Sequence, residues 1–83
     1  MRYLIMSRSL TYAQRAARVL ERAGVSAGVI KAPAGLSSNG CSYSVAVAIN
    51  RGEKAVSILR SAGLLQGKIY LQKADNSVEE VIM

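Results

Sequence analysis

The clearest pattern along the chain is an alternation of large and small side chains over residues 43–49. Tyrosine, valine or isoleucine occupies every second position, with serine or alanine between. This period of two is typical of a strand with one buried face. Residues 2–6, 25–31 and 68–73 are short apolar runs with branched or aromatic members. The pattern therefore predicts four strands.

A helical period separates the first two strands. Apolar residues recur every three or four positions from Leu10 to Leu20, which predicts an amphipathic helix over residues 10–23. The N-cap is either Thr11, which has Gln14 three residues later as in a capping box, or Ser9. Gly24 stands where a helix commonly ends with a residue in the left-handed conformation. The opposite face of this helix carries three arginines: Arg15, Arg18 and Arg22.

A second helix is predicted between the third and fourth strands. It begins at Asn50, which has Glu53 at capping spacing, and it ends at Gly63. The order strand, helix, strand, strand, helix, strand predicts an α+β, ferredoxin-like βαββαβ sandwich. Its antiparallel sheet would have the order 4-1-3-2, with both helices on one face.

The expected domain spans residues 1–74, and residues 75–83 form an acidic tail with a possible extra strand at 78–83. The sheet face away from the helices would present an apolar surface too large for a small monomer to expose. We expect the tail or a symmetric second copy to cover it. The residues on that surface are Leu4, Met6, Ala46 and Ala48.

The amino-acid composition limits which kinds of site, location and partner the protein can have. The 83 residues contain one cysteine and no histidine, so no internal disulfide can form and neither a metal site nor a cofactor is expected. No apolar run is long enough for a secretory signal or a membrane span. These features predict a cytoplasmic protein that does not enter a membrane. Eleven Lys or Arg against five Asp or Glu give a net charge of +6, which attracts nucleic acid, acidic proteins or small oxyanions.

The candidate chemical group is the single thiol, Cys41, in a segment of small and polar residues between two strands. In the predicted topology this segment emerges at the same end of the sheet as the start of the first helix. The helix N-terminus and Arg8 are then expected to lower the pKa of the Cys41 thiol and favour the thiolate. Backbone amides and hydroxyls of the segment would support a sulfur anion or a small oxyanion: Pro33, Gly35, Ser37, Ser38, Gly40 and Ser42.

A plainer interpretation stays open beside this one. A lone cysteine in a small protein can be an inert buried side chain, and three arginines on a helix can be a solvated face.

One set of short motifs stands out along the chain: Ala32-Pro33, Leu36-Ser37 and Gly40-Cys41 ahead of a strand of small residues, and a helix end at 59–63. With these motifs the sequence resembles the small selenium/sulfur carrier-like proteins of the DUF3343 family. The resemblance spans residues 3–71.

The resemblance implies that Cys41 carries sulfur or selenium as a persulfide or selenopersulfide. A cysteine desulfurase-like donor would supply it and an acceptor protein would receive it, so the chain would be a non-turnover carrier rather than a self-sufficient enzyme. Two positions depart from the family pattern: Ser42 stands where glycine is common, and Ala34 where arginine is common. If that arginine binds an anion or a partner in the family, this function has moved or is lost here.

Two other functions remain open. RNA recognition motifs share the order of elements, and the net charge suits nucleic acid. However, the predicted third strand offers one aromatic residue, Tyr43, on the same face as the core valines, which disfavours base stacking. The other alternative is a structural subunit of a small homo-oligomer.

Overall fold

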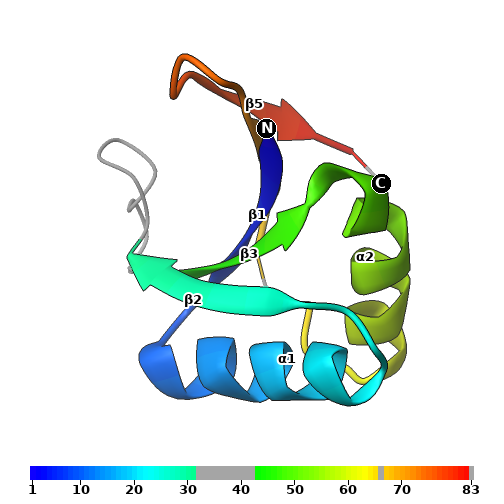
Figure 1. The fold of residues 1–83 in the computed structure, drawn as a ribbon. Helices are drawn as coiled ribbons and strands as arrows, with labels where there is room; N and C mark the ends of the chain where they lie inside the picture. The colour runs from blue at the N-terminus through cyan, green and yellow to red at the C-terminus, as the bar shows by residue number, and fades with distance from the viewer. Residues whose placement is uncertain (32–42, 66, 83) are drawn as a thin grey trace.

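The computed structural model of the chain describes residues 1–31, 43–65 and 67–82. Two α-helices pack against one face of a five-stranded sheet (Figure 1). In chain order the elements are β1 (Arg2–Ser7), α1 (Leu10–Arg22), β2 (Ala27–Lys31), β3 (Tyr43–Ala48), the 3-10 helix η2 (Ile49–Arg51), α2 (Gly52–Ser61), β4 (Ile69–Gln72) and β5 (Val78–Val81).

The strand order is β2-β3-β1-β4-β5, and every neighbouring pair is antiparallel. The first four strands have the predicted order 4-1-3-2, and β5 is added at the outer edge of β4. The predicted α+β, ferredoxin-like arrangement is therefore confirmed. Because β1 is the central strand, its pairing with β3 and β4 fixes the positions of both halves of the chain.

The hydrophobic core lies between the sheet and the two helices. Alternate strand residues such as Ile5, Val45 and Val47 point into it, and the other members of each strand point to the opposite face. Helix α1 contributes mostly alanines, which allow it to lie close to the sheet. The core residues with at most 2% exposure are Ile5, Ala13, Ala16, Leu20, Val25, Val45, Val47, Ala55, Val56 and Leu59.

The ends of α1 follow its sequence signals. Ser9 is the N-cap, because its hydroxyl accepts a hydrogen bond from the backbone N–H of Tyr12 at 3.3 Å. The alternative start at Thr11 is wrong. After the helix, Gly24 has φ +85°, the left-handed conformation that glycine adopts without steric cost.

The start of α2 differs from the prediction. Asn50 does not cap the helix but lies within η2, and α2 begins at Gly52 without a side-chain cap. The chain makes one tighter turn after β3, and Gly52 then fits against the ring of Tyr3, where a β-carbon would collide with it. The predicted end is correct, since Gly63 has φ +72°.

The C-terminal residues extend the sheet and do not lie across its open face. Val81 pairs with Ile69 and packs against the core on the helix side. Two ion pairs join β5 to the residues on either side of β4: Lys68 to Glu80 at 3.4 Å and Lys73 to Glu79 at 3.2 Å. The tail therefore cannot be the cover that we expected for the open face.

Two residues of that open face are nevertheless buried. Leu4 is 0% exposed and Met6 is 3% exposed, whereas Ala46 is half-buried and Ala48 is exposed. Leu4 and Met6 are thus already buried in a single copy of the chain, so no second copy is required to cover them.

A tight turn connects β4 to β5. The N–H of Asn76 donates to the carbonyl of Lys73 at 2.9 Å, and Asn76 adopts φ +68°. The carboxylate of Asp75 accepts hydrogen bonds from the N–H and hydroxyl of Ser77, at 3.0 Å and 2.6 Å. These bonds lower the pKa of Asp75, because they favour its ionised form.

Within the described residues, no helix has the length and apolarity that a membrane-crossing helix requires. Residues 1–31, 43–65 and 67–82 also contain no cluster of three His, Cys, Asp or Glu side chains that could hold a metal ion.

Candidate functional site

Three strands meet in one row at the end of the sheet from which residues 32–42 leave and return. Lys31, the last residue of β2, pairs with Tyr43, the first residue of β3, and Tyr43 also pairs with Ser7, the last residue of β1. Cys41 precedes Tyr43 by two positions in the sequence. The chain on both sides of the cysteine-containing segment is thus held beside the end of β1.

The residues that follow Ser7 begin helix α1 at this same end (Figure 1). Arg8 is exposed, and Ser9 uses its hydroxyl to cap the helix. The first turn of α1 contains no acidic residue that would cancel the positive end of its dipole. Together with Lys31, these groups make this end of the sheet favourable for an anion.

The proximity of Arg8 to the ends of the cysteine segment was predicted from topology. Cys41 itself, with the predicted supporting residues of its segment, lies outside the described residues. Those supporting residues are Pro33, Gly35, Ser37, Ser38, Gly40 and Ser42.

A buried hydroxyl next to this row was missed by the sequence reasoning. Ser44 is 0% exposed, and its Oγ has no hydrogen-bond partner. It faces away from the helices, between Met6 of β1 and Ile30 of β2. A buried hydroxyl without a partner costs about 1–3 kcal/mol, and a role at a functional site is one of the reasons for which proteins keep such a group. The available signal was a serine within an otherwise apolar strand, but serine also fitted the small half of the alternation.

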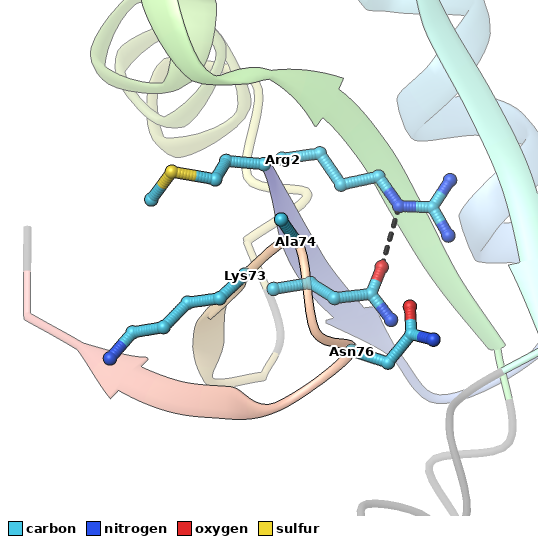
Figure 2. Close-up of a pocket in the computed structure, with 6 residues that line it drawn as sticks. Arg2, Lys73, Ala74 and Asn76 are labelled. Atoms are coloured by element: carbon cyan, nitrogen blue, oxygen red, sulfur yellow. Dashed lines mark hydrogen bonds between the residues drawn. The ribbon is translucent and has the colours of Figure 1, made fainter.

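A recess lies at the other end of β1, where the strand begins (Figure 2). Its volume is about 250 Å³, and the side chain of Arg2 is held across it by a hydrogen bond from Nε to Oε1 of Gln72 at 2.7 Å. Arg2 and Ser7 are five residues apart, which is about 17 Å along a strand. This recess is therefore separate from the end of the sheet where Lys31 and Tyr43 pair.

The open face offers little for stacking nucleic-acid bases. Tyr3 and Tyr43 point to the helix side, where both contact the core. Among the described residues of β1, β3 and β4, Tyr70 is the aromatic residue on the open face, and it is half-buried opposite Leu4. The arrangement thus lacks the paired stacking platform of RNA recognition motifs.

Comparison with protein families identifies the chain. A family model described as "Putative Se/S carrier protein-like" matches residues 2–71. The chain belongs to this family. The matched region runs from β1 to β4 and includes Cys41, whereas β5 lies beyond it. Membership in the Se/S carrier-like family confirms the resemblance that the sequence indicated.

No curated protein and no solved structure matches the chain. The family description is accordingly the comparison that bears on function. It indicates sulfur or selenium transfer in general, and it names neither donor nor acceptor.

Proposed function

We propose that this member of the Se/S carrier-like family carries sulfur or selenium on Cys41, as a persulfide or selenopersulfide. The observation that carries the proposal is the row formed by Lys31, Tyr43 and Ser7. Lys31 and Tyr43 flank the segment that contains the chain's only thiol, and this row holds them beside Ser7. Arg8 and the start of α1 follow Ser7 directly. A positive helix end and a guanidinium favour the thiolate, which is the reactive form of cysteine.

The transfer needs no net oxidation. The thiolate of Cys41 attacks the outer sulfur of a persulfide on the donor protein, so that a new S–S bond forms on Cys41. The donor's own S–S bond breaks, and its electron pair leaves with the donor cysteine as a thiolate. The proton of the outer sulfur stays with the transferred atom. Delivery repeats the exchange, with an acceptor nucleophile attacking the outer atom and Cys41 leaving as a thiolate.

This chemistry fits what the sequence contains. The reaction requires one accessible thiolate, and the donor and acceptor supply every other reacting group. A disulfide reductase would use a second, resolving cysteine, and the sequence has only one. The proposed role is therefore a non-turnover carrier between a cysteine desulfurase-like donor and an acceptor protein. The reducing cytoplasm is the proposed location, because it keeps a single thiol reduced.

Intact-mass measurement tests the proposal. The protein is incubated with a cysteine desulfurase and cysteine, and a carrier gains the mass of one sulfur atom that a thiol reductant then removes. Cys41→Ser is the matched control and should gain none. Wild-type protein that stays unmodified by the desulfurase, while its thiol reacts freely with an alkylating reagent, would overturn the proposal.

A further inference from the structure

The net charge of the molecule is concentrated in its helix layer. Residues 8–22 and 51–60 contain seven Lys or Arg and two Glu, a net of +5 out of the total of +6. The rest of the chain carries four Lys or Arg and three acidic residues, a net of +1. The field of the protein is therefore strongest on the side of α1 and α2.

The centre of this field is the arginine face of α1, formed by Arg15, Arg18 and Arg22. All three side chains are exposed, on the side of the helix away from its buried alanines. Within the part of the chain that the structure describes, none of them forms a salt bridge. Both ion pairs found there instead join lysines to the glutamates of β5. Two of the five carboxylates are thus paired at the far edge of the sheet. On α1 a single carboxylate, Glu21, accompanies the three arginines, which leaves the helix a net charge of +2.

One arginine of this face is held in place by an aromatic ring. The guanidinium carbon of Arg15 lies 5.9 Å from the centroid of the Tyr12 ring, a cation–π distance. Tyr12 is 39% exposed, so the ring and the guanidinium both remain available at the surface. Arginine and tyrosine are the residues enriched at the energetic centres of protein interfaces. Stacking also reduces the entropy that Arg15 would lose on binding.

The arginine face begins close to the end of the sheet that holds the cysteine segment. Arg15 is five residues into α1, about 8 Å along the helix from Leu10. A protein interface of standard size buries about 800 Å² on each side, a patch roughly 30 Å across. The whole chain measures 30 × 26 × 20 Å. One docked protein can therefore cover the arginine face and reach the end of the sheet at Ser7.

We propose that the arginine face of α1 docks an acidic surface of the protein that exchanges sulfur or selenium with Cys41. The identity of that protein as a transfer partner rests on the proposed function, whereas the acidic chemistry of its surface rests on the charges described here. A protein surface is favoured over RNA because the open face of the sheet lacks the paired aromatic residues on which bases stack.

Two triple variants with the same net charge test the docking face. Arg15→Gln, Arg18→Gln and Arg22→Gln together neutralise it, and glutamine is a good helix former, so α1 should persist. Arg2→Gln, Lys68→Gln and Lys73→Gln together remove three charges away from the helix layer. A 20-residue polyglutamate peptide serves as the acidic probe and a 20-nucleotide oligouridylate as the RNA probe.

The helix variant should bind polyglutamate roughly tenfold more weakly than wild type, the sum of three exposed charge pairs. The sheet variant should lose less than about threefold in affinity for polyglutamate. Its three substituted charges lie away from the arginine face, and salt partly screens their attraction for a peptide bound there. Oligouridylate should bind weakly, lose affinity steeply with salt and respond to both variants alike. Equal loss of polyglutamate binding in both variants overturns the proposal. A selective loss of oligouridylate binding in the helix variant also overturns it and favours RNA as the ligand.

A loading experiment separates this proposal from the proposed function. The rate of sulfur transfer from a cysteine desulfurase should fall in the helix variant and not in the sheet variant, and modification by inorganic polysulfide should be unchanged in both. If the wild type gains no sulfur from the desulfurase, the carrier role fails while the polyglutamate result still decides the docking face. Equal loading of both variants by the desulfurase contradicts the docking role.

Discussion

Gly52, the first residue of α2, lies directly against the ring of Tyr3 in β1, with no room between them for a methyl group. Its φ of −58° is an ordinary helical value, so space and not backbone conformation requires glycine here. The contact sets how closely the start of α2 approaches the central strand. The 3-10 helix η2 leads into it directly after β3.

This contact predicts different effects for two glycine substitutions. Gly52→Ala should reduce the free energy of unfolding by about 1–3 kcal/mol, because the added carbon forces the Tyr3 ring or the helix to move. Gly28→Ala in β2 is the control, since open space surrounds the position that its β-carbon would take. It should be neutral or stabilising by up to about 1 kcal/mol. Urea unfolding of both variants measures this, and equal stability would refute the contact.

The packing of β5 predicts that residues beyond 74 contribute to stability. Val81→Ala removes two methyl groups from a half-buried side chain that contacts the core, and should cost about 0.5–1.5 kcal/mol. The adjacent Ile82 is 94% exposed, so Ile82→Ala should leave the unfolding midpoint unchanged. Thermal or urea unfolding compares the two. A Val81→Ala protein as stable as the wild type would mean that β5 does not pack in solution.

The turn between β4 and β5 predicts a pH effect at Asp75. Hydrogen bonds from Ser77 lower the pKa of Asp75 in the folded protein. Its contribution to stability is therefore present above the unfolded pKa and is lost as the pH falls through the folded pKa. Ser77→Ala should move the NMR titration midpoint of the Asp75 carboxyl upward, because one of two hydrogen bonds is lost. Ser57→Ala, remote on α2, should not move it, and an unchanged midpoint in Ser77→Ala would argue against this turn.

The proposed carrier role predicts a reactive thiol. We expect the pKa of Cys41 to lie below its ordinary value, so that the alkylation rate reaches its midpoint at a lower pH than for a free cysteine. Arg8→Ala should raise that midpoint by less than about one pH unit, as loss of one partly screened charge implies. Arg2→Ala, at the other end of β1, should leave it unchanged. Cys41→Ser should remain folded.

Alkylation of the folded protein also shows which result would contradict a reactive thiol. Cys41 that resists alkylation until denaturant is added is a packing residue, and the carrier proposal then fails.

Patterns that repeat along the chain predicted most of the fold. The alternation at 43–48, the helical period after Ser9 and the two left-handed glycines, Gly24 and Gly63, all have local causes that a sequence displays. Asn50 was misassigned because a capping signal is local and does not distinguish the start of an α-helix from a 3-10 turn that precedes it. The contact of Gly52 with Tyr3, some fifty residues earlier, has no local signal in the sequence.

The sequence predicted where in the fold the candidate site lies better than it predicted which residues surround it. Topology alone brings Arg8 to the end of the sheet where residues 32–42 begin and return, since strands joined through a helix must run in the same direction. The unpartnered hydroxyl of Ser44 could not be predicted, because a small polar residue in an alternating strand gives no sign of which face is buried or what lies against it.

The paired ends of β2 and β3 make the residues between them an exchangeable insert. Lys31 and Tyr43 are held opposite each other, and β1 fixes the register of β3 from its other side. The entropy of closing such a connection changes slowly with its length, by about 0.6 kcal/mol for each doubling. The closure entropy alone would therefore change little if a segment of another length replaced residues 32–42. Natural variation or deliberate grafting can thus change the thiol's surroundings while the scaffold stays the same.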